Sequence, residues 1–124
     1  MKKTWLGMLI GFGLTACDEP QPLTDADLAA KEAEIRAMIG DASCADASAC
    51  ASMAFGAKPC GGPWEYLIYC VDSVDEEVLQ AHVDAYFDLN QQYNFENGIA
   101  SDCSVVEEPA LDWVDGTCVV ASND

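Results

Sequence analysis

Positive charge is scarce in this sequence. Lysine and arginine together number 5 against 22 aspartates and glutamates, which gives a formal net charge of −17. A nucleic-acid-binding protein needs a basic surface to displace the counterions that condense on phosphates, and anionic lipid headgroups likewise attract basic segments. The composition therefore excludes nucleic acid as a partner and disfavours direct binding to an anionic membrane surface.

Histidine and closely spaced cysteine pairs are also scarce. The one histidine is His82, and no C-x₂-C spacing occurs anywhere in the chain. Structural zinc sites draw their four ligands from such cysteines and histidines. We therefore expect no metal and no cofactor.

The N-terminal apolar run is too short to span a membrane. Residues 5–14 cover only about half of a bilayer's hydrocarbon core at about 1.5 Å per residue. They follow two lysines and precede Leu14-Thr15-Ala16-Cys17, in the order of a secretory signal. Leu14 would occupy position −3 of a cleavage site, where the A-x-A pattern needs a small residue. The four residues instead resemble the lipobox of a bacterial lipoprotein.

This resemblance implies three regions and a location. Residues 1–16 would be removed as a signal peptide, Cys17 would be lipidated within a linker at 17–22, and residues 23–124 would form one globular domain. The mature chain would keep three cations against all 22 carboxylates, a formal charge of −19. We expect a lipid-anchored protein of the cell envelope that faces the periplasm. Asp18 resembles an inner-membrane retention signal, although the outer membrane stays an alternative.

The remaining cysteines are even in number, which is typical of a disulfide framework in an exported domain. Six cysteines allow fifteen pairings, and their spacing does not choose among them. We predict three disulfides among Cys44, Cys50, Cys60, Cys70, Cys103 and Cys118.

Periodicity and caps predict two helices and several short strands. Thr24 is a helix N-cap and Gly40 a stop, so residues 25–39 form the first helix. A capping box of Ser73 and Glu76 begins the second helix, which Asn97-Gly98 ends. Its apolar stripe is expected to include Leu79, Val83, Tyr86, Phe87 and Tyr93.

The strands are expected at residues 50–55 and 64–70, joined as a hairpin, with a second hairpin turn at Asp115-Gly116. The stretch 64–70 is apolar on both faces, which predicts a central, covered strand. Cys103 is expected to tie the end of the second helix to the sheet. The fold class is α+β: one small antiparallel sheet packed against two helices and held by three disulfides.

The loop between the first two strands is the candidate binding surface. A loop stiffened by prolines and a disulfide presents a preorganised surface, and one hypothesis has its lysine entering the specificity pocket of an enzyme. The alternative is a braced hairpin turn, because turns routinely use glycine and proline. The candidate residues are Lys58, Pro59, Gly61, Gly62, Pro63 and Trp64.

The same loop carries a second resemblance. The stretch Gly56-x-Lys58-Pro59-Cys60-Gly61-Gly62-Pro63 and the later Ser101-Asp102-Cys103 look like a group of small exported bacterial proteins that contain cysteines. The resemblance covers about residues 44–118. That group has no established activity, so the resemblance implies no catalytic residues.

Catalytic patterns are weak. His82 lies on the edge of the predicted apolar stripe, and neither Asp84 nor Asp88 shares its helix face. Asp88-Leu89-Asn90 begins like a calcium loop, but Tyr93 stands where that loop needs glycine. We therefore expect a protein that is not an enzyme.

Three functions remain, in order of preference. The first is a non-enzymatic module that binds a basic protein of the envelope through an acidic surface. The second is an inhibitor of an envelope-directed protease or lysozyme, and the third is a small hydrolase. The sequence leaves the oligomeric state open.

Overall fold

A computed structural model describes residues 21–122 together with Gly7, Gly11 and Gly13. Cys17, Asp18 and the rest of the predicted signal segment lie outside the described residues. The elements follow the order α1 (Asp25–Ile39), a short 3₁₀ turn (Ala47–Ala49), β1 (Cys50–Phe55), β2 (Glu65–Cys70), α2 (Glu76–Asn97), β3 (Leu111–Val114) and β4 (Thr117–Val120). None of the helices in this part of the chain is long and apolar enough to cross a membrane.

Helix α1 begins and ends where the sequence predicted. The hydroxyl of Thr24 accepts a hydrogen bond from the Asp27 N–H, and the Asp27 side chain accepts one from the Thr24 N–H, which completes a capping box. The N–H and the hydroxyl of Thr24 both donate to the Asp27 carboxylate and lower its pKa. The helix ends at Gly40, whose φ of 64° suits glycine.

Helix α2 begins at a different cap from the predicted one. Asp75 is the N-cap and its carboxylate accepts from the N–H groups of Glu77 and Val78, whereas Ser73 donates to the Ser43 carbonyl oxygen. The predicted box of Ser73 and Glu76 is therefore wrong, because a carboxylate two residues further along satisfies the free N–H groups. The predicted stop is confirmed, with Gly98 in the left-handed conformation.

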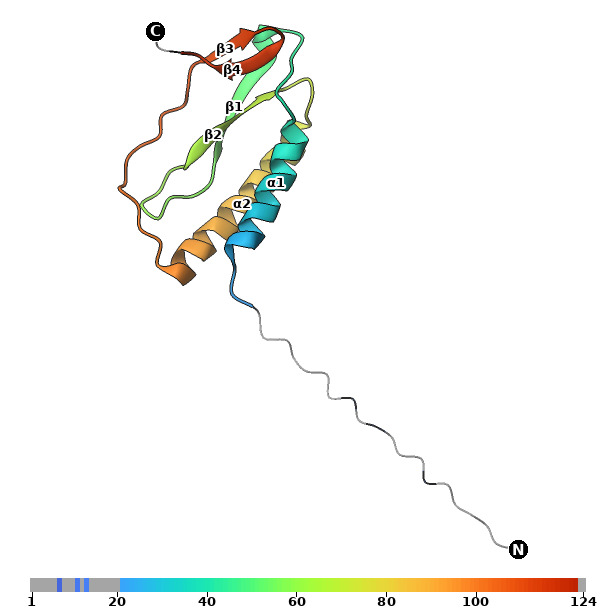
Figure 1. The fold of residues 1–124 in the computed structure, drawn as a ribbon, viewed down its shortest axis with the longest axis vertical. Coiled ribbons are helices and arrows are strands. Elements are labelled where there is room, and N and C mark those ends of the chain that lie inside the picture. Colours follow the sequence, from blue (N-terminus) through green and yellow to red (C-terminus); the bar gives the residue numbers. More distant parts are fainter. Residues whose placement is uncertain (1–6, 8–10, 12, 14–20, 123–124) are drawn as a thin grey trace, which may run out of the picture.

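The two helices lie antiparallel against one face of the first sheet (Figure 1). Near the start of α1, Leu23 N–H donates to the Glu96 carboxylate at the end of α2. Leu67 and Tyr69 of β2 face the helices in the main core, where Phe55 stacks on Tyr86 with ring centroids 4.3 Å apart. The main core consists of Leu28, Ile35, Phe55, Leu67, Tyr69, Leu79, Val83 and Tyr86.

The strands form two small sheets instead of one. β1 and β2 pair antiparallel from Cys50↔Cys70 to Phe55↔Glu65, and β3 pairs with β4. The second hairpin turns at Asp115 and Gly116, whose φ angles of 51° and 79° fit the predicted two-residue turn. β2 is therefore an edge strand and not a central one, although both its faces are covered: by the helices on one side and by the Cys118 cluster on the other.

The fold class is thus the predicted α+β arrangement of two helices, small antiparallel sheets and three disulfides. Disulfides of this kind persist in oxidising compartments, which agrees with an extracytoplasmic location.

Candidate functional site

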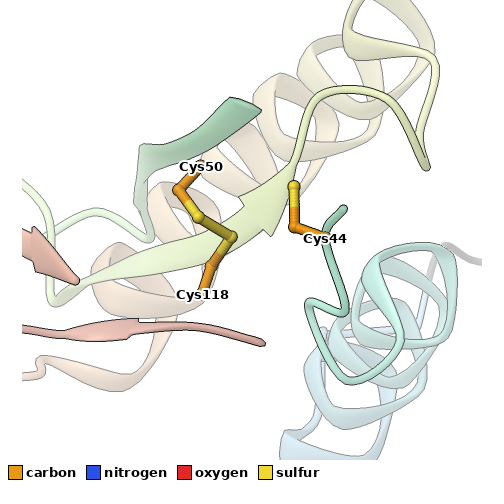
Figure 2. Close-up of side chains that lie close together, drawn as sticks. All are labelled: Cys44, Cys50 and Cys118. Carbon is orange, nitrogen blue, oxygen red and sulfur yellow. A yellow bond between two sulfur atoms is a disulfide. The ribbon is translucent and has the colours of Figure 1, made fainter. Parts of the chain in front are cut away.

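Two of the three disulfides lie side by side at the end of the first sheet. Cys44 pairs with Cys70 and Cys50 with Cys118. Figure 2 shows the Cys50–Cys118 bond next to the Cys44 side chain, and the sulfur atoms of these three residues lie within 4.8 Å of one another. Each of these sulfurs is bonded to another sulfur, whereas a metal ligand is a thiolate. The cluster joins the second hairpin to the first and acts as a staple.

The third disulfide braces the predicted binding loop. Cys60, in the β1–β2 loop, pairs with Cys103 in the segment after α2. Cys103 therefore ties the segment after α2 to the β1–β2 loop, whereas the sequence predicted a tie to the sheet itself. Gly61 and Gly62 adopt φ angles of 100° and 82°, the left-handed region that suits glycine.

Lys58 does not project from this loop. Its residue is 7% exposed, and its ammonium group donates to the carbonyl oxygen of Ser104 at 2.7 Å and to the Ser104 hydroxyl at 3.3 Å. The same nitrogen lies 5.3 Å from the centre of the Trp64 ring and 4.0 Å from an oxygen of Asp102. The hypothesis that Lys58 enters an enzyme's pocket is therefore wrong, because the side chain is used inside the protein.

Asp102 is held in place by the same segment. Hydrogen bonds from the backbone N–H and then the hydroxyl of Ser104 are the main reason that its pKa lies below the ordinary value, and the charge of Lys58 adds a smaller effect. The β1–β2 loop thus has the features of the braced hairpin turn that the sequence offered as the alternative to a binding loop.

Two buried asparagines of α2 complete the brace, and the sequence reasoning missed both. Asn90 Oδ1 accepts from the Ala57 N–H at 2.7 Å, and Asn94 Nδ2 donates to the Ala57 carbonyl oxygen at 2.7 Å. Both follow Tyr86 at helical spacing on the buried face of α2. The sequence signal for them was a pair of asparagines that continue the apolar stripe of the helix at a spacing of four residues.

A groove runs between strand β1 and the flank of α2. Its first part has a volume of about 630 Å³ and is lined by Ser52, Met53, Ala54, Tyr69, Glu76, Glu77, Gln80, Ala81 and Asp84. Its second part, about 230 Å³, continues past the shared residues Ala54, Gln80 and Asp84 to Gly56, Gly62, Pro63, Val83 and Phe87. We call the two parts together the β1–α2 groove.

One end of the β1–α2 groove is acidic and the other is apolar. Glu76 and Glu77 supply two carboxylates at the first end, Asp84 adds a third where the two parts meet, and no lysine or arginine lines either part. Phe87 stands at the other end with 39% of its surface exposed, although the sequence had placed it within the buried stripe. The groove therefore has an acidic end and an apolar end.

The acidic end holds one tyrosine in place. Tyr69 donates a 2.8 Å hydrogen bond to the Glu76 carboxylate. Burial first, and then this bond and the charge of Glu76, raise the pKa of Tyr69 to about 12.

The cations within residues 21–122 are all engaged away from the groove. Arg36 pairs with Glu32 and Glu65, and Lys58 is buried behind Trp64. His82 lies at the partly buried edge of the core, with its Nδ1 2.7 Å from the ammonium group of Lys31. The carboxylates of the groove consequently have no cation of this part of the chain beside them.

Comparison with known protein families, curated proteins and solved structures finds no match to this chain. The site must therefore be interpreted from its own geometry and charge.

Proposed function

We propose that this protein is a non-enzymatic binding module that captures a cationic segment of another envelope protein in the β1–α2 groove. The observation that carries the proposal is the set of three groove carboxylates, Glu76, Glu77 and Asp84, without a cation of the described chain beside them. An external lysine or arginine there gains attraction from several carboxylates at once, and because all three are exposed this attraction is screened by salt.

The overall charge supports this choice of partner. A formal charge of −17 accelerates the approach of a basic protein and repels acidic ones. An inhibitor of a basic enzyme such as a lysozyme would be one form of the same module, acting through the acidic groove and not through Lys58.

We further propose that lipidation of Cys17 holds the module at the membrane, facing the periplasm, and that Asp18 favours the inner membrane. The lipobox resemblance and the three disulfides support this location. Labelled palmitate should enter the wild-type protein and not the Cys17→Ser variant. Equal labelling of the two would contradict lipidation at that residue.

The groove is tested by neutralising its carboxylates. The triple variant Glu76→Gln, Glu77→Gln, Asp84→Asn should lose a basic protein that the wild type retains from envelope extract. The matched control is Asp72→Asn, Glu107→Gln, Asp115→Asn, which removes the same charge at exposed residues outside the groove. The control should keep that protein, and raising the salt to about 1 M should release it, because the Debye length falls to about 3 Å. Identical proteins on all three baits would overturn the proposal.

A further inference from the structure

Strand β1 has an open hydrogen-bonding edge along the groove. In an antiparallel pair, residues alternate between those bonded to the partner strand and those whose N–H and C=O point away from it. The bond from the Val71 N–H to the Ala49 carbonyl oxygen fixes this alternation for β1 and β2. Ser52 and Ala54 therefore direct their backbone groups away from β2, and both residues line the groove.

No segment of residues 21–122 forms backbone hydrogen bonds with this edge, although the Ser52 hydroxyl donates to the Glu108 carboxylate at 2.8 Å. The first sheet contains only β1 and β2, and the isolated bridge in this part of the chain joins Ser43 to Thr117 elsewhere. An open edge is a template for another strand, and proteins that keep one protect it with charge or cover it. Here the carboxylates of Glu77 and Asp84 flank it, so a second copy of this acidic chain is repelled while a cationic strand is attracted.

We propose, building on the proposed function, that the cationic segment binds as an extended strand added to the edge of β1. Main-chain hydrogen bonds to Ser52 and Ala54 would give affinity, and side chains on one face of the added strand would enter the groove.

The dimensions of the groove set the spacing of those side chains. Glu77 and Phe87 are ten residues apart on α2, which corresponds to about 15 Å along the helix. A strand covers about 3.3 Å per residue, so about four to five residues span this length. Side chains on the same face of a strand are an even number of residues apart, and four is the even number that fits this length. The ligand therefore carries a lysine or arginine and an apolar residue four positions apart.

The probe is a nine-residue, threonine-rich peptide with lysine at its second and fourth positions and phenylalanine at its sixth. It is titrated by fluorescence polarisation against the disulfide-intact protein. We expect at least tenfold weaker binding when glutamate replaces both lysines, and when Glu77→Gln and Asp84→Asn are introduced into the protein. The control Asp72→Asn, Glu107→Gln, Asp115→Asn should bind like the wild type.

Backbone methylation of the peptide tests the strand itself without altering the protein's fold. N-methyl groups on the even positions and on the odd positions are compared, because only alternate N–H groups of an added strand meet β1. One of the two peptides should bind at least tenfold more weakly and the other nearly as well as the parent. Ala54→Pro, which removes an outward N–H and leaves the β1–β2 bonds, should weaken binding similarly.

The outcomes separate the two proposals. Equal binding of both methylated peptides, with dependence on the groove carboxylates retained, would overturn strand addition and leave the proposed function standing. If neutralising the groove carboxylates leaves the affinity unchanged, or if the parent peptide does not bind, both strand addition and the proposed function are overturned. A concentration-dependent dimer joined through β1, seen by sedimentation, would show a second copy to be the occupant and would overturn the inference.

Discussion

The ammonium group of Lys58 donates a 2.7 Å hydrogen bond to the carbonyl oxygen of Ser104, 46 residues further along the chain. The bond joins the β1–β2 loop to the segment after α2, alongside the Cys60–Cys103 disulfide. A buried cation that satisfies a backbone carbonyl holds a loop firmly, and this loop forms the apolar end of the β1–α2 groove through Gly62 and Pro63.

Replacing Lys58 by methionine should destabilise the protein by about 2 kcal/mol or more, because a charge-assisted bond is lost and the Ser104 carbonyl loses its partner. Urea unfolding measures this loss. Lys31→Met is the control: the Lys31 ammonium lies 3.5 Å from Glu34 and 2.7 Å from His82 Nδ1 but binds no backbone carbonyl, so a smaller loss of about 1 kcal/mol is expected. Equal unfolding midpoints for the two variants would contradict the role given to Lys58.

Replacing Gly56 by alanine should lower the free energy of unfolding by about 2–4 kcal/mol. The φ of Gly56 is 83°, and an added Cβ would lie 2.8 Å from Trp64 Cδ1 and 3.3 Å from Asn90 Oδ1, so backbone strain and overpacking combine. Gly61→Ala provides the comparison: its φ is 100°, but nothing lies within 4 Å of the added Cβ, so a loss of about 1 kcal/mol is expected. A smaller loss at Gly56 than at Gly61, measured in urea, would show that this contact is not tight.

Limited reduction should open Cys60–Cys103 before the other disulfides. Both of its cysteines are exposed, whereas Cys70 and Cys118 are only 1% and 3% exposed. A thiolate reductant must reach the sulfur that it attacks. Alkylation and mass spectrometry after a short exposure to dithiothreitol should therefore label residues 60 and 103 first. Earlier labelling of residues 50 and 118 would mean that the buried cluster opens more readily than its burial implies.

The raised pKa of Tyr69 predicts a stability change at alkaline pH. The folded protein keeps the phenol proton up to about pH 12, whereas an unfolded chain loses it near the ordinary tyrosine pKa of 10.0. This contribution is fully present below pH 10 and is lost as the pH rises towards 12. The free energy of unfolding should fall less steeply between pH 10 and 12 in Tyr69→Phe than in the wild type. Parallel curves would show that Tyr69 does not titrate differently on folding.

Local signals in the sequence predicted the elements well. Helix caps and tight turns depend only on residues that are close together in the sequence. The confirmed examples are Thr24, Gly40, Gly98 and the Asp115-Gly116 turn. The start of α2 was missed by two residues because Ser73 and Asp75 are both good caps, and only the tertiary contact of Ser73 with Ser43 separates them.

The groove and the disulfide pairing could not be predicted in this way. The open edge of β1 exists because the second hairpin forms its own sheet and does not extend the first, which depends on contacts distant in sequence. Glu76 and Glu77 lie in the first turn of α2, where negative charge is favourable. Their position beside β1 follows from packing of α2 across the sheet, and so does their role in the proposed site.

Amide hydrogen exchange with and without the nine-residue cationic peptide tests the central claim most directly. The account predicts that the Ser52 and Ala54 N–H groups, open at the edge of β1, become protected when the peptide binds, while residues of β3 and β4 are unaffected. Protection that appears elsewhere while Ser52 and Ala54 still exchange at their free rates would contradict it.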